Sequence, residues 1–136
     1  MAYVHVTLRG WVSAFAFTQA VEIPVYVTLL RRALKADLAK RPQRLPLQIL
    51  LAFGASAITH PVVWFVLPRL EPSFTDPGPA YIEYVLRAES FALVIEALYF
   101  YTLCAARFRH TLLASLLANG LSAGIGMASR SLFGFP

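Results

Sequence analysis

The chain has 136 residues, of which 58% are hydrophobic and only 14% are charged, and its mean hydropathy is +0.62. This balance lies outside that of soluble domains, so it predicts an integral membrane protein and excludes a soluble catalytic domain or nucleotide site of any size. One cysteine excludes an internal disulfide. The net charge of +5 does not indicate nucleic acid, because half of the twelve Lys and Arg residues crowd into residues 31–44, beside an apolar run.

Four apolar runs, each of about 20 residues, are long enough to cross the ~30 Å hydrocarbon core of a bilayer. The first begins at Trp11 and stops at Arg31, and the second closes at Pro68. An acidic, proline-rich connection precedes the third run, and a short basic turn joins it to the fourth. The sequence therefore predicts an all-α, polytopic bundle of four transmembrane helices in a single membrane domain, residues 1–136, with spans at about 11–30, 47–67, 84–105 and 111–129.

The distribution of Lys and Arg predicts the orientation of this bundle. The connections that join the first span to the second and the third to the fourth carry eight of these residues, and the opposite side carries four. Because positively charged loops stay in the cytoplasm, we expect the 31–44 segment there and both termini outside. The same segment is expected to contact anionic lipid headgroups, so the lipid bilayer is the first predicted partner.

Corresponding residues in the first and second halves of the chain indicate an internal repeat. Glu22 and Tyr26 in the first span match Glu96 and Phe100 in the third at the same offsets. The second and fourth spans align in two equally good registers, one that pairs Ser56 with Ser115 and one that pairs Ser56 and Thr59 with Asn119 and Ser122. Either register predicts a parallel repeat of two helix pairs about an axis along the membrane normal.

Each predicted span carries polar residues at helical spacing, which places them on one face. An ionisable group in hydrocarbon costs roughly 2.5 kcal/mol or more, so we expect these faces to point into the bundle. At a rise of 1.5 Å per residue, Glu22, Glu96 and Asn119 lie near mid-membrane, while His60 and Glu89 lie nearer the outer face. The predicted polar core, which would bind an ion or substrate, comprises Gln19, Glu22, Thr59, His60, Glu89, Glu96, Asn119 and Ser122.

The buried acids have two open interpretations. Glu22 and Glu96 are either structural groups that hydrogen-bond across the bundle or an ion or proton site. The residue types also suit a divalent metal such as zinc, iron or manganese as a cofactor, with Glu22, His60, Glu89 and Glu96 as possible ligands. The sequence contains neither the Glu-x-x-His motif of di-iron bundles nor His-Glu-x-x-His.

Residues 120–124 match the Gly-x-Ser-x-Gly string of serine nucleophiles, and Ser122 lies at a depth similar to that of His60. In a soluble hydrolase this string occupies a strand-to-helix turn, which a membrane span does not offer. Gly120 and Gly124 also form a Gly-x-x-x-Gly pair, which allows close approach of another helix. We expect that helix to come from a second copy, in a homo-oligomer, or from another membrane subunit.

The arrangement of polar residues resembles that of a group of small four-span prokaryotic membrane proteins. The matching residues are Glu22, then Thr59-His60-Pro61 with Trp64, then Glu89 and Glu96, and finally Asn119 with Ser122. The resemblance implies a functional polar core in a prokaryotic cytoplasmic (inner) membrane but no particular activity. We expect a non-enzymatic protein, either an accessory subunit of a membrane complex or a small ion, proton or solute carrier. The alternative is an intramembrane metal-dependent or hydrolytic enzyme.

Overall fold

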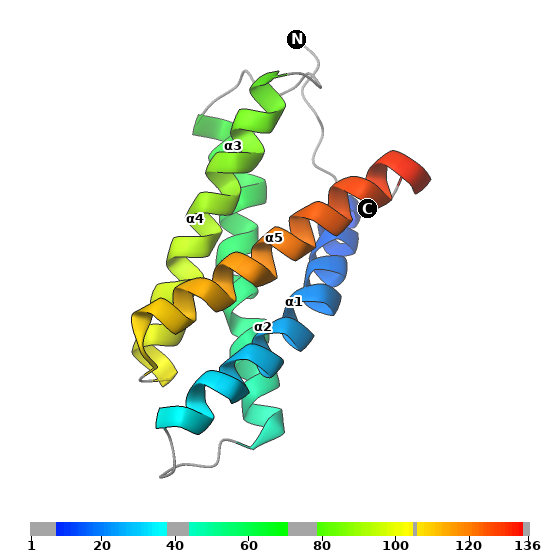
Figure 1. Cartoon of the computed structure of the whole chain (residues 1–136). Helices are drawn as coiled ribbons and strands as arrows, with labels where there is room; N and C mark the ends of the chain where they lie inside the picture. The colour runs from blue at the N-terminus through cyan, green and yellow to red at the C-terminus, as the bar shows by residue number, and fades with distance from the viewer. Residues whose placement is uncertain (1–7, 38–43, 71–78, 105, 135–136) are drawn as a thin grey trace.

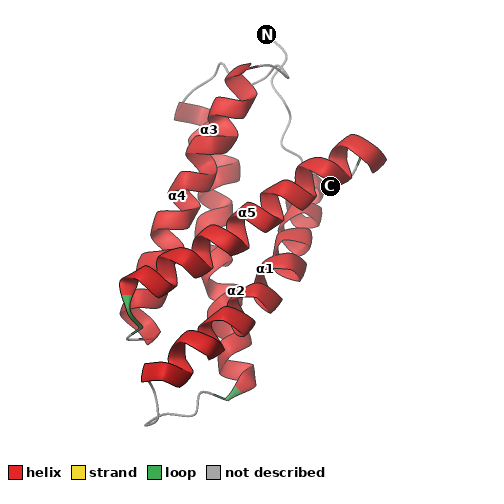
Figure 2. Cartoon of the chain, viewed as in Figure 1, coloured by secondary structure: helices red, strands yellow, loops and turns green. Residues whose placement is uncertain are grey.

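A computed structural model describes residues 8–37, 44–70, 79–104 and 106–134 of the chain (Figure 1). All regular structure in these residues is helical (Figure 2). The elements are α1 (Leu8–Asp37), α2 (Leu45–Pro61), η1 (Val62–Val66), α3 (Leu67–Leu70), α4 (Pro79–Cys104) and α5 (Phe108–Phe133). Because α2, η1 and α3 follow one another without a break, the described chain forms four long helices.

Three of these helices are long enough and apolar enough to cross a membrane. They are Leu8–Leu29 within α1, Leu45–Leu70 across α2 to α3, and Phe108–Phe133, which is α5. This confirms the prediction of a membrane protein with several spanning helices. The helix α4 has 26 residues and a length of about 39 Å, but Glu83, Arg87, Glu89 and Glu96 keep its composition too polar to identify it as a span.

The first helix extends further than the sequence predicts. We expected the membrane span to stop at Arg31, yet α1 continues through the two arginines to Asp37, so the first part of the 31–44 segment is helical. Arg, Ala, Leu and Lys are all good helix formers, so charge ends the apolar stretch without ending the helix. The basic residues Lys40 and Arg41 and the acidic connection 71–78 lie outside the described residues.

The four long helices pack in a ring. The helix α1 contacts α2 and α5, and α4 contacts the same two helices. In Figure 1, α5 starts beside the end of α4 and crosses obliquely over α1. This order places α1 diagonally opposite α4, and α2 diagonally opposite α5.

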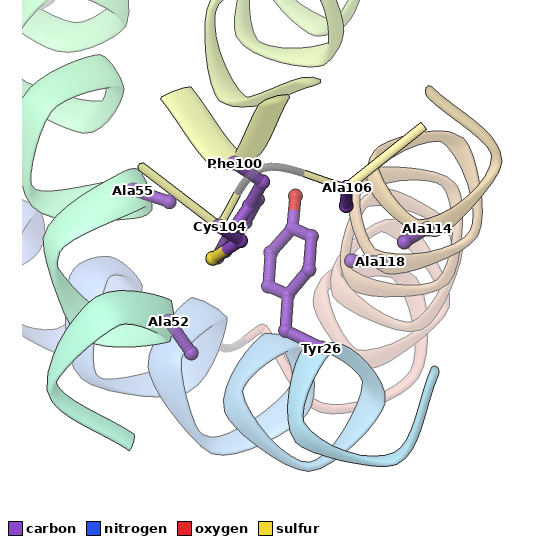
Figure 3. Close-up of a cluster of buried hydrophobic side chains, with 8 residues drawn as sticks. All are labelled: Tyr26, Ala52, Ala55, Phe100, Cys104, Ala106, Ala114 and Ala118. Carbon is purple, nitrogen blue, oxygen red and sulfur yellow. The ribbon is translucent and has the colours of Figure 1, made fainter. Parts of the chain in front are cut away.

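The apolar core fills one half of the bundle, where α1 and α4 end and α2 and α5 begin. The ring of Tyr26 points into the middle of the bundle, with its centroid 4.6 Å from that of Phe100 (Figure 3). Small side chains and one cysteine surround the two rings: Ala52, Ala55, Cys104, Ala106, Ala114 and Ala118. Such small residues let helices approach closely. We call this part of the bundle the Tyr26 half and the opposite part the His60 half.

A π-helical turn, η1, follows Pro61 in the His60 half. Proline has no backbone N–H and cannot complete the regular α-helical pattern, and the chain here takes the wider π spacing. The backbone carbonyl of Val63 in this turn accepts a hydrogen bond from the Tyr84 hydroxyl on α4. A hydrogen bond therefore joins the irregular turn to α4.

Candidate functional site

Glu96 lies at the centre of the bundle, where only 1% of its surface is exposed. Its carboxyl group accepts hydrogen bonds from Thr59 Oγ1 on α2 at 2.6 Å, from Asn119 Nδ2 on α5 at 2.8 Å and from the Tyr26 hydroxyl on α1. One carboxyl group of α4 is thus bonded to each of the other three long helices.

Glu22 on α1 is 2% exposed and is bonded in a similar way. Its two oxygens accept hydrogen bonds from the Ser56 hydroxyl on α2 and from Ser122 Oγ on α5, the latter at 2.7 Å. The two acids therefore belong to diagonally opposite helices and share α2 and α5 as the source of their donors.

Neither central acid has a positively charged partner within the described ranges. Every hydrogen bond to Glu22 or Glu96 comes from a neutral hydroxyl or amide. An ion pair does occur in α4, between Arg87 and Glu83, but it is exposed. A carboxylate charge buried without a counter-charge is costly. A proton or a bound cation at each acid would remove this cost.

A cavity of about 150 Å³ extends from the two acids into the His60 half. The predicted site residues in its wall are Glu22, Thr59, His60, Glu89, Glu96, Asn119 and Ser122, and the apolar lining includes Ala14, Phe17, Val63, Trp64 and Ala92. The two layers that depth along the helices predicted therefore open into one space. Gln19 is buried but does not line it, and its amide nitrogen donates to the carbonyl of Phe53 at 3.4 Å.

His60 and Glu89 differ from the central acids because each has a buried atom without a hydrogen-bond partner. These atoms are His60 Nδ1 and Glu89 Oε2. The imidazole ring is packed among Trp11, Phe15 and Trp64, at centroid distances of 6.1, 5.1 and 5.7 Å. These rings pack around the imidazole but do not hydrogen-bond to Nδ1. This nitrogen therefore has no hydrogen-bond partner in the described site.

The geometry gives little support to metal binding or hydrolysis. In the part of the chain that the structure describes, no three or more His, Cys, Asp or Glu residues form a group able to hold a metal ion. The possible ligands Glu22, His60, Glu89 and Glu96 share a cavity without forming such a group. The hydroxyl of Ser122 donates to Glu22, so a nucleophile–base hydrogen bond from Ser122 to His60 is not formed.

Gly120 and Gly124 lie on an exposed face of α5. A Cβ atom built at either position meets nothing within 4 Å. Among the residues described, no other helix of this chain packs against the pair. Their use in close packing against another molecule remains a prediction.

Three residues of the hydrogen-bonded core are missing from the predicted set: Tyr26, Ser56 and Ser115. Tyr26 follows Glu22 by four residues and Ser56 precedes Thr59 by three, so helical spacing places both on the predicted polar faces, although not in the predicted site. Ser115 Oγ donates to the backbone carbonyl of Leu93 on α4 at 2.9 Å. Its position is consistent with the polar face of α5, but no spacing in the sequence indicates a backbone partner.

Comparisons of the chain with protein-family models, with curated proteins and with solved structures each found no match. The fold and the site therefore define the class of protein. It is a helical membrane protein with several spanning helices and two buried acids beside a partly open cavity.

Proposed function

We propose that the chain is a small membrane carrier that takes up a proton at the Glu22–Glu96 pair. The observation that carries this proposal is the burial of two carboxyl groups among neutral donors only, at the end of a cavity. Interhelical hydrogen bonds contribute only about 0.6 kcal/mol on average, whereas a charged residue inside the membrane costs roughly 2.5 kcal/mol or more. Hydroxyls and amides alone would hold the helices together at a lower cost.

The proposal takes α4 as the fourth spanning helix. Its most buried acid, Glu96, faces the interior, and its exposed residues Val94, Leu98 and Leu103 give the outside of the helix an apolar surface. The exposed Glu83–Arg87 pair lies near the start of the helix, where the headgroup region accommodates charge. By the positive-inside rule, the Tyr26 half faces the cytoplasm of a prokaryotic cell and both termini lie outside.

The two halves of the bundle support access to the acids from one side in this conformation. The cavity reaches Glu22 and Glu96 from the His60 half, and the buried cluster around Tyr26 and Phe100 closes the other half. Tyr26 links the two regions, because its hydroxyl bonds to Glu96 while its ring packs on Phe100. Proton binding at Glu96 changes this hydrogen bond and so acts directly on the residue that closes the cytoplasmic side.

The hydrogen bonds also support an internal repeat of two helix pairs. When Ser56 and Thr59 are aligned with Asn119 and Ser122, the donors to Glu22 correspond to two of the donors to Glu96. The bond from Ser56 to Glu22 matches that from Asn119 to Glu96, and the bond from Ser122 to Glu22 matches that from Thr59 to Glu96. Together with the diagonal placement of α1 and α4, this favours the second of the two registers.

Proton flux in liposomes tests the carrier role. The wild-type chain is expected to carry protons under an imposed membrane potential, read by an enclosed pH-sensitive dye. Glu96→Gln and Glu22→Gln are each expected to abolish the flux, because glutamine keeps the size of the acid and one acceptor oxygen but cannot exchange a proton. Glu83→Gln is the matched exposed control and should keep the flux. Wild-type flux equal to that of empty liposomes would overturn the carrier role.

A subunit of a larger membrane complex is the second candidate, and the open face at Gly120 and Gly124 favours it. Two glycines one turn apart on an exposed helix allow a partner backbone to approach closely. The test is the mass of the assembly extracted in a mild detergent. Gly120→Leu is expected to release the partner, whether a second copy or another subunit, while leaving the helix content unchanged. A wild-type chain that is monomeric when extracted would contradict this role.

A further inference from the structure

The His60 half of the cavity contains two polar atoms that the proton-binding pair does not use. His60 is 9% exposed, and its Nδ1 has no partner; Glu89 Oε2 is also buried without one. Both side chains line the cavity. Buried polar atoms are nearly always hydrogen-bonded, and each one left unpaired costs about 1–3 kcal/mol. A ligand in this cavity that bonded to both atoms would remove these costs.

The chemistry of the two atoms defines what that ligand must offer. An ionised Glu89 accepts hydrogen bonds only, and His60 Nδ1 also accepts when the imidazole proton is on Nε2. The cavity wall contains three carboxyl groups, and no Lys or Arg of the described chain lines it. A ligand with several N–H donors and a positive charge is therefore favoured over an anion.

A metal ion meets these requirements less well than an ammonium group. Hard cations take six or more oxygen ligands, but the oxygens of Glu22 and Glu96 already accept hydrogen bonds from the protein. An ammonium group needs only a few directed acceptors. Trp64 and Phe17 in the wall add aromatic faces that attract organic cations.

The volume of the cavity sets the size of the ligand that it can enclose. At about 150 Å³, it matches an engineered cavity that binds one benzene molecule, which has about six non-hydrogen atoms. We propose that the cavity binds a primary alkylammonium ion of this size, which donates to Glu89 Oε2 and His60 Nδ1. Its alkyl chain lies against Ala14, Val63 and Ala92. This assignment rests on the carrier function proposed above and names the substrate class of that carrier.

Intrinsic fluorescence can measure this binding directly. The chain has two tryptophans, Trp11 and Trp64, and both rings contact His60. The wild-type chain in phosphatidylcholine nanodiscs is expected to show a saturable change in emission with n-butylammonium. n-Butanol and Na⁺ at the same concentrations should produce no such change, because one lacks the charge and the other lacks the N–H donors.

Glu89→Gln is expected to weaken butylammonium binding at least tenfold. Ser90→Ala, the next residue, is exposed and serves as the matched control with unchanged affinity. Circular dichroism and the unfolding temperature establish that each variant is folded, so weaker binding by Glu89→Gln reports on the site. Equal affinity in Glu89→Gln and the wild type overturns the proposal, as does equally tight binding of tetrabutylammonium, which exceeds the volume of the cavity.

Flux and binding measurements together distinguish the ammonium site from the carrier role. Glu96-dependent proton flux without saturable butylammonium binding overturns the ammonium site and leaves the carrier role intact. Saturable, Glu89-dependent binding without flux supports the ammonium site and overturns the carrier role.

Discussion

The ionisable side chains at the two ends of the cavity differ in their hydrogen bonding. At the central end, Glu96 accepts three hydrogen bonds and Glu22 accepts two, so the protein itself satisfies both acids. At the other end, His60 Nδ1 and Glu89 Oε2 have no partner. The first arrangement joins helices, and the second leaves a cost that a bound molecule can remove. Burial alone therefore does not identify a ligand-binding group; a buried atom without a hydrogen-bond partner, on a side chain that lines a cavity, is the better indication.

Removing the acceptor at the central end is expected to have the largest effect on stability. Glu96→Ala removes the hydrogen bonds from Tyr26, Thr59 and Asn119 and leaves these donors only longer bonds of 3.1–3.4 Å to Ser115 and to the backbone of α2. Since each lost hydrogen bond costs about 1 kcal/mol, the free energy of unfolding should fall by about 3 kcal/mol or more. Detergent-induced unfolding followed by circular dichroism measures the change. Glu83→Ala, which removes an exposed ion pair, should cost no more than about 1 kcal/mol. Equal stability of the two variants would contradict the role given to Glu96.

A change at the other end is expected to have the opposite sign. Glu89→Leu removes a buried oxygen that has no partner and replaces it with an apolar side chain. The free energy of unfolding should rise by about 1–2 kcal/mol, measured by the same unfolding experiment, while butylammonium binding is lost. A loss of stability in this variant would show that the two ends do not differ as described.

The correspondence between the two halves of the chain is tested by smaller changes. Ser56→Ala and Ser122→Ala each remove one donor to Glu22 and should each lower the free energy of unfolding by about 1 kcal/mol. A fluorophosphonate probe for catalytic serines should leave Ser122 unlabelled, because its hydroxyl donates a hydrogen bond to Glu22. If the probe instead labels Ser122 in the wild type and not in His60→Ala, the result would support hydrolysis.

The smallest effect is expected in the Tyr26 half, at Gly54. A Cβ atom there would lie 2.6 Å from the phenol oxygen of Tyr99, which is the free end of a side chain that can move. The gain in helix propensity, about 1 kcal/mol, should offset this clash, so Gly54→Ala is expected to be nearly neutral. In a Tyr99→Phe background the clash is absent, and the same change should stabilise by up to about 1 kcal/mol. Gly120→Ala, which meets nothing within 4 Å, is the control for propensity alone.

Most of the fold follows from the sequence, because hydropathy and proline positions mark the long helices. The end of α1 at Asp37 does not follow, since hydropathy reports where the apolar stretch stops rather than where the helix stops. The sequence predicts which face of each helix carries the site. Depth and spacing group Glu22, Glu96 and Asn119, but they do not determine the hydrogen-bond partner of each side chain. Gln19 shares the polar face of α1 with Glu22 and yet bonds to the backbone of Phe53 rather than lining the cavity.

Because of the π turn at Val62–Val66, the shape of the cavity depends on the number of residues in this part of the helix as well as on their side chains. Each hydrogen-bonded ring of a π-helix contains one more residue than that of an α-helix, and this turn carries Val63 and Trp64 of the cavity wall. Deleting a single residue here would let the helix run on as a regular α-helix and would remove the wider turn that carries Val63 and Trp64. The wall would then be reshaped with no change to any acid, so insertions and deletions near Pro61 alter the site more than most substitutions do.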